Sequence, residues 1–216
     1  MNPAPPVPAP GSRPDGWEES LRAFGDAARW FARTTATATG RWELPGLGEW
    51  DVRALVGHTS RSLLTVETYL GRPAPAVDVG TAADYYRATR RLAAGPGVAQ
   101  RGREAGAALG EDPAAAVPAI AERVLALVER CDGTELVTTI AGGMRLAEYL
   151  PTRTFELTVH TADLAVALGT PADVPRTAAA QALRLVADLA AGDGRAAELL
   201  LAATGRTGLP RGFSVL

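Results

Sequence analysis

The sequence is poor in several residue types that build functional sites. Among its 216 residues it has one cysteine, two histidines, two methionines and no lysine. A single cysteine excludes a disulfide within the chain and a zinc site built from several cysteines. Cys131 precedes Gly133 at an expected helix end, and we interpret it as an inert, partly buried thiol. We attribute the missing lysine, together with the abundant Ala, Gly and Pro, to codon usage.

Long apolar runs and strong charge are also missing. No run approaches the roughly 20 apolar residues of a membrane-spanning helix. The net charge of −2 gives no broad positive electrostatic field that would attract nucleic acid or an anionic membrane. The first residues lack the basic and apolar regions of a secretory signal. We therefore expect a cytoplasmic protein without nucleic-acid or membrane partners, as a monomer or homodimer.

The pattern of apolar and cap residues along the chain predicts an all-α protein. Residues 1–15 are rich in Pro and Ala and are expected to form a disordered tail. Residues 16–216 are expected to form one helical domain with a small β-hairpin within 134–150. Apolar residues at helical spacing and cap residues place the helices: 17–37, 52–70, 81–94, 98–109, 112–131, 151–168, 173–190 and 194–204. Four long helices suit a bundle, and the polar helix 98–109 is expected to face solvent.

The stretch 153–164, RTFELTVHTADL, contains the main candidate functional residues. Glu156 and His160 are four residues apart, so a helix stacks both on one face. Phe155, Val159 and Val166 flank this face on one side, and Leu157 and Leu164 flank it on the other. A carboxylate at the centre of an inward face needs a partner, because burying it alone is costly.

The opposite face of this helix carries small residues, which we expect to meet solvent or loose packing: Thr154, Thr158, Thr161 and Ala165. Asp163 follows His160 by one turn and suits a partner for the distal ring nitrogen of that histidine. Arg153 precedes Glu156 by one turn, and it suits either an ion pair with Glu156 or contact with a substrate anion.

The only other histidine, His58, lies in the predicted helix 52–70, for which Asp51 is a good N-cap. Two imidazoles and a carboxylate on facing helices can bind a divalent metal and leave coordination positions open. A surface Glu–His pair is the common alternative for this spacing, and the residues alone leave both interpretations open. Arg61, one turn after His58, is a weaker candidate for substrate binding.

Two motifs carry a resemblance to a known family. WDVRALVGHTSRS around His58 and RTFELTVHTADLA around His160 resemble the mycothiol-dependent maleylpyruvate isomerase N-terminal family of the DinB-like superfamily. The closing TGRTGLPRGFSVL is also similar to the end of many such sequences. The resemblance implies a DinB-like four-helix bundle and a metal, usually zinc, held by His58, Glu156 and His160, with Asp163 behind them.

The resemblance also implies a chemistry. Family members with known activity use the thiol mycothiol as isomerases or S-transferases, with a metal that favours the thiolate. We therefore expect a metal- and mycothiol-dependent transferase or isomerase acting on a small electrophile. The full isomerase has a separate C-terminal domain, for which this chain has no room, so the maleylpyruvate reaction itself is not expected. A metal-activated hydrolase and a non-catalytic metal- or ligand-binding module remain alternatives.

Overall fold

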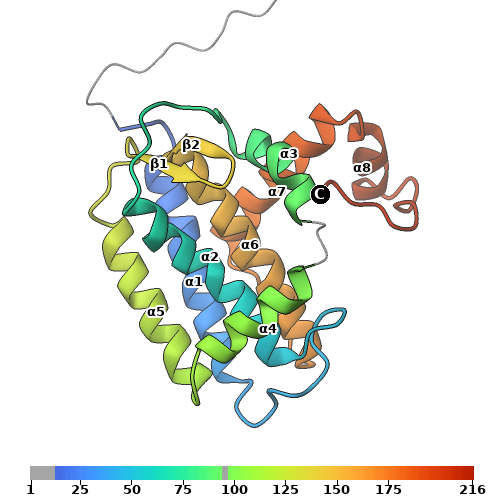
Figure 1. Ribbon diagram of the computed structural model, residues 1–216. Helices are drawn as coiled ribbons and strands as arrows, with labels where there is room; N and C mark the ends of the chain where they lie inside the picture. Colours follow the sequence, from blue (N-terminus) through green and yellow to red (C-terminus); the bar gives the residue numbers. More distant parts are fainter. Residues whose placement is uncertain (1–12, 94–96) are drawn as a thin grey trace, which may run out of the picture.

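The computed structural model describes residues 13–93 and 97–216. The predicted tail at 1–15 therefore falls almost entirely outside the described residues. Within them the chain forms eight helices and one small sheet (Figure 1). In chain order these are α1 (Trp17–Ala36), α2 (Val52–Leu70), α3 (Ala82–Ala93), α4 (Val98–Ala108), α5 (Pro113–Val128), β1 (Leu136–Thr139), β2 (Gly142–Arg145), α6 (Leu146–Ala167), α7 (Arg176–Gly192) and α8 (Ala196–Ala203). The predicted all-α class with a small hairpin is confirmed.

Helices α1, α2, α5 and α6 form the four-helix bundle. Both α1 and α2 pack against α5 on one side and against α6 on the other, which closes the bundle. Helix α7 packs on α1 and α6, while α3 contacts α6 and α7 (Figure 1). The antiparallel hairpin joins α5 to α6, and its second strand continues directly into α6. None of the helices in the described residues combines the length and apolarity needed to cross a bilayer.

The helix starts have local chemical causes. The Asp51 side chain accepts a hydrogen bond of 2.7 Å from the amide of Ala54 and caps α2 as predicted. Asp112 caps α5 in the same way, and Pro113 occupies the first turn, where its missing N–H costs nothing. These caps fix where α2 begins and therefore which face of α2 carries His58.

Helix α4 is more tightly packed than predicted. Its charged residues face solvent, but Gly102 and Gly106 are buried against α2. A Cβ atom at Gly57 of α2 would lie 2.1 Å from the Gly106 nitrogen, so only glycine permits this backbone approach. Glycine contributes no apolar side chain to a hydropathy pattern, so this contact was not predicted from the sequence.

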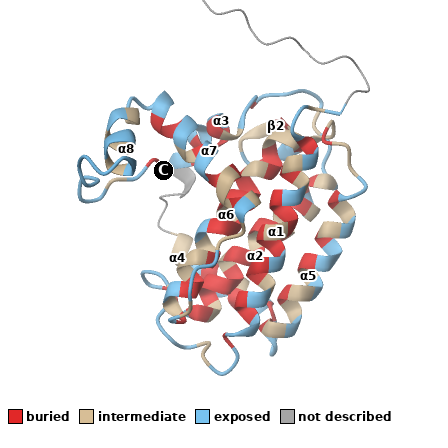
Figure 2. Ribbon diagram, turned by 180° about the vertical axis from the view of Figure 1, so that it is seen from behind, coloured by how far each residue is buried: buried red, intermediate tan, exposed pale blue. Residues whose placement is uncertain are grey.

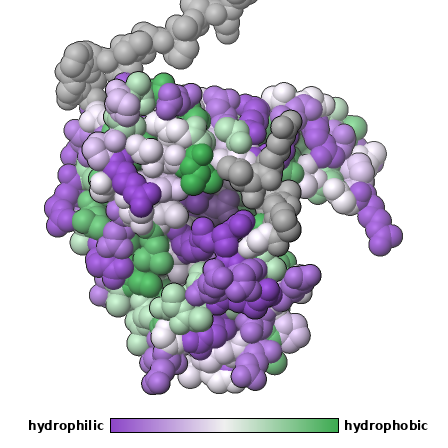
Figure 3. Space-filling model, viewed as in Figure 1, coloured by the Kyte–Doolittle hydropathy of each residue, from purple (hydrophilic) through white to green (hydrophobic). Residues whose placement is uncertain are grey.

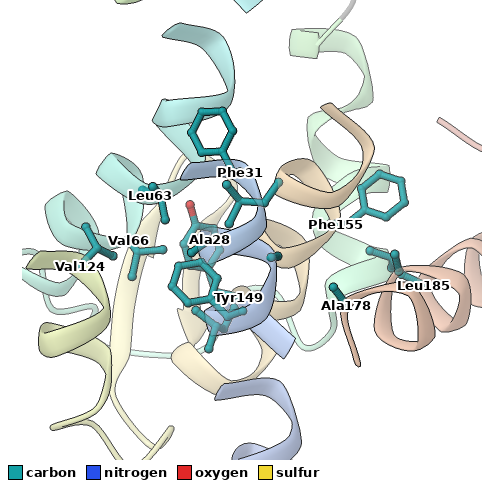
Figure 4. Packing of buried hydrophobic residues seen from close by; sticks show 14 of the residues in the cluster. Ala28, Phe31, Leu63, Val66, Val124, Tyr149, Phe155, Ala178 and Leu185 are labelled. Atoms are coloured by element: carbon teal, nitrogen blue, oxygen red, sulfur yellow. The ribbon is translucent and has the colours of Figure 1, made fainter. Parts of the chain in front are cut away.

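Tightly packed apolar side chains fill the bundle (Figure 4). Phe31 of α1, Leu63 of α2 and Tyr149 of α6 are fully buried members of this core. A further group joins α6 to α7 through Phe155, Ala178 and Leu185. Buried residues line the inner faces of the bundle helices, whereas α8 has no buried residue (Figure 2).

The threonine face of α6 was predicted wrongly. Thr154 and Thr161 are fully buried, and Thr158 is only 6% exposed, because this face packs in the bundle. Thr154 and Thr158 donate their hydroxyl protons to carbonyls one turn earlier, which satisfies them without an external partner. By contrast, Val166, expected near the inward face, is 74% exposed. The Glu156–His160 face lies beside the core and faces a pocket.

Candidate metal centre

The packing of α2 on α6 brings three distant residues together. His58 lies in the second turn of α2, and Glu156 and His160 lie one turn apart on α6. Each offers one ligand atom, and these atoms all lie within 4.8 Å of one another. The rings of His58 and His160 stand edge to face with their centroids 4.8 Å apart. The three residues predicted as metal ligands thus converge at one point between two helices.

His160 uses both ring nitrogens. Its Nε2 lies 3.3 Å from Glu156 Oε2, and its Nδ1 lies 3.1 Å from Asp163 Oδ2. Asp163 therefore occupies the place predicted for it behind the ring. Burial lowers the pKa of His160, but the contacts with Asp163 and Glu156 outweigh this effect and raise the pKa to about 9.

Glu156 is held in the ionised form. Burial raises the pKa of its carboxyl group, but the contact with His160 and the charge of Arg153 outweigh this and lower the pKa to about 2. For His58, burial and the neighbouring His160 lower the pKa to about 4. At neutral pH the metal-free cluster therefore contains a carboxylate, a neutral imidazole and an imidazolium.

Trp50 orients the third residue of the cluster. Its ring lies against His58 with centroids 4.4 Å apart, and its indole N–H donates to the Ala99 carbonyl at 3.0 Å. Gly102 makes room for it, since a Cβ there would lie 2.4 Å from the indole nitrogen. Trp50 is therefore both a buried packing residue and part of the pocket wall.

These residues fit a divalent metal. His58 Nδ1 is buried without a hydrogen-bond partner among the described residues, and such an atom is costly unless something else bonds it. Two imidazoles and one carboxylate are a donor set typical of zinc and of neighbouring transition metals. Asp163 supplies the outer hydrogen bond that usually orients a ligating histidine.

The cluster lies in the wall of a large pocket of about 770 Å³. Figure 3 shows a recess near the middle of the molecule with hydrophilic residues around it. Helices α2, α3, α4 and α6 contribute to its walls, with Leu47, Ile140 and Leu216 from other segments. A pocket of this volume can hold a small organic ligand and is much larger than a site for a single water molecule.

Arginines supply the positive charge of the pocket. Arg153, Arg61 and Arg101 all line it, and none forms an ion pair within the described residues. Arg153 is only 9% exposed, and its guanidinium carbon lies 5.0 Å from the Tyr149 ring centre and 5.4 Å from that of Tyr85. Its Nε donates to Thr152 Oγ1 at 2.9 Å. Of the two roles considered for Arg153, the ion pair with Glu156 does not form, which leaves contact with a substrate anion.

One contact of the cluster was not predicted from the sequence. The Tyr86 hydroxyl of α3 donates a hydrogen bond of 2.6 Å to Glu156 Oε1. Tyr86 is buried, at 8% exposure. No pattern in one sequence distinguishes a tyrosine that only packs from one whose hydroxyl reaches a carboxylate 70 residues away.

Cys131 lies away from this pocket, at the end of α5. Burial and the nearby Glu135 raise the pKa of its thiol to about 12, which disfavours the reactive thiolate. This agrees with the interpretation of Cys131 as inert.

The fold and the site define the class of the protein, and a comparison with known families then gives its family. A helical bundle with a His–Glu–His cluster in an open pocket defines a candidate metal-binding bundle protein. The model of the mycothiol maleylpyruvate isomerase N-terminal domain matches residues 21–165. The chain belongs to this family, as the two motifs predicted. No curated protein and no solved structure shows significant similarity to the chain.

Proposed function

We propose that the protein is a metal-dependent enzyme that uses mycothiol as a cosubstrate and acts on a small electrophile, as an S-transferase or isomerase. The observation that carries this proposal is the convergence of His58, Glu156 and His160 in the wall of a pocket of about 770 Å³. The family match, which names a mycothiol-dependent isomerase, supports the choice of thiol. Residues 16–216 would form one functional domain, since α7 packs on helices inside the matched region.

In this proposal His58, Glu156 and His160 hold a divalent metal, and their donor set suits zinc. When bound, the metal would favour the thiolate of a thiol that reaches its open side. Asp163 fixes the His160 ring by accepting from Nδ1, and Trp50 shields one face of His58 from water. A cytoplasmic location would suit a reaction that needs a reduced thiol.

Arg153 and Arg61 would bind an anionic group of the electrophile or of the thiol. A buried guanidinium without a carboxylate partner is costly, and a ligand anion would offset this cost. Arg153 is flanked by two tyrosine rings and bonded to Thr152, so its position is fixed before a ligand arrives. The substrate most compatible with these two arginines in the pocket wall is a small anionic electrophile.

Titration of a cobalt(II)-substituted sample with mycothiol tests the proposal. Sulfur bonded to cobalt gives a strong near-ultraviolet absorption, which should appear on adding mycothiol and saturate at one equivalent. S-methylated mycothiol is the matched control, because it keeps the sugar part but cannot form a thiolate, and it should leave the spectrum unchanged. An unchanged spectrum with mycothiol itself would refute the thiol-dependent function and leave a hydrolase or a binding module.

A further inference from the structure

Glu156 has a second partner besides His160, and it comes from outside the bundle. The Tyr86 hydroxyl lies 2.6 Å from Glu156 Oε1 and 3.2 Å from the Thr152 carbonyl. A phenol has only one proton to donate, and the shorter contact to a charged acceptor is the stronger one. Tyr86 therefore donates to Glu156.

The two carboxylate oxygens of Glu156 have different surroundings. Oε1 accepts from Tyr86, whereas Oε2 faces His160 Nε2 at 3.3 Å. A carboxylate fixed in this way cannot rotate without losing a charge-assisted hydrogen bond. It would present Oε2 to a metal and keep Oε1 away from it, which favours one ligand oxygen over two.

The Tyr86 ring is itself held firmly. It packs edge to face on Phe155 with centroids 5.4 Å apart, and on Tyr85 at 5.7 Å. Its side chain is only 8% exposed. Helix α3 is in turn joined to the turn after α7 by an ion pair of Arg87 with Asp193 at 3.5 Å. Packing therefore positions the Tyr86 hydroxyl before any ligand binds.

We propose that Tyr86 is a positioning residue of the metal centre, which holds Glu156 in a geometry with a single ligand oxygen. This inference rests on the proposed metal site and adds a residue that acts through Glu156 without touching the metal. It also makes α3 a part of the site, although α3 carries none of the three ligands.

Tyr86→Phe tests the inference, because it removes the hydroxyl and keeps the ring. The readouts are zinc affinity by competition with a chromophoric chelator, and the visible spectrum of the cobalt(II) form. Tyr149→Phe is the matched control: its ring is also buried, but its hydroxyl bonds Thr65 Oγ1 at 3.0 Å. Melting of both metal-free variants shows whether either has lost its fold.

We expect Tyr86→Phe to bind zinc about 10- to 100-fold more weakly, as loss of an outer hydrogen bond to a ligand usually does. Its cobalt spectrum should change, since Oε1 becomes free to bind, whereas Tyr149→Phe should match the wild type in both readouts. Wild-type affinity or an unchanged cobalt spectrum in Tyr86→Phe would overturn the inference while leaving the metal site intact. A wild-type protein that binds no metal would instead overturn the proposed function.

Discussion

Glu156 and His160 differ from an ordinary surface pair in their surroundings. A Glu–His pair four residues apart normally points to water and contributes little. Here Tyr86 bonds one carboxylate oxygen, Asp163 bonds the far ring nitrogen, and His58 approaches from a second helix. The contacts with Tyr86 and Asp163 fix the orientation of the pair, and Glu156 Oε2 and His160 Nε2 face each other on the side that His58 approaches.

The protonation states of the cluster predict how metal binding depends on pH. In the metal-free protein the pKa of His160 is about 9, because its bonds to Asp163 and Glu156 outweigh the effect of burial. The pKa of His58 is lowered to about 4, mainly by burial. At pH 7 a metal must therefore displace one proton, from His160, and none from His58 or Glu156.

Calorimetry of zinc binding at pH 7 in two buffers of different ionisation enthalpy measures this number. We expect one proton released per zinc ion, and an affinity that rises about tenfold per pH unit between about pH 5 and 8 and levels off above 9. Release of no proton, or of two, would show that the protonation states assigned to the two histidines are wrong.

At the scale of elements, the contact between α2 and α4 supports the site. Gly57 directly precedes His58, and its Cα faces the backbone of Gly106. A methyl group there would lie 2.1 Å from a backbone nitrogen, which cannot move aside as a flexible side chain would. The two helices would have to separate, and His58 and Trp50 lie at their junction.

Gly57→Ala is therefore expected to lower the free energy of unfolding by about 1–3 kcal/mol, as overpacking usually does, even though alanine favours helix. Urea unfolding of the metal-free protein measures this change, and zinc affinity should fall with it. Gly80→Ala is the control, because a Cβ there meets no atom within 4 Å and should change neither quantity. Equal stability of Gly57→Ala and Gly80→Ala would contradict the tight contact.

The elements also show what one sequence can predict. Apolar spacing and the Asp51 and Asp112 caps gave the positions of α2 and α5, because these signals are local. Periodicity failed for the threonine face of α6 and the glycine face of α4, since neither residue type stands out as apolar. The three candidate ligands were found through their rarity and the family resemblance, whereas the Tyr86 contact depends on tertiary packing alone.

At the scale of the whole molecule, a metal would join α2 to α6 across the bundle. A ligand that binds only the folded protein stabilises it according to its free concentration and dissociation constant. With free zinc at a hundred times that constant, the gain is about 2.7 kcal/mol. For a chain of this size, this corresponds to a rise in melting temperature of about 5–11 °C.

Thermal unfolding with zinc and with excess chelator measures this gain. Asp173→Ala is a suitable control, since Asp173 is exposed and lies between α6 and α7, outside the pocket, so its response to zinc should equal that of the wild type. Glu156→Ala should melt at the same temperature with and without zinc. A wild-type melting temperature that does not respond to chelator would contradict a metal that bridges the bundle.

Metal content of the purified protein is the direct test of a metal centre at His58, Glu156 and His160. The measurement is elemental analysis by mass spectrometry of the wild type, His58→Ala, His160→Ala and Asp173→Ala, each dialysed against metal-free buffer after loading with zinc. We expect one zinc ion per chain in the wild type and in Asp173→Ala, and less than about a tenth of that in both histidine variants. A wild type without zinc, or histidine variants that retain it, would contradict a metal centre at His58, Glu156 and His160.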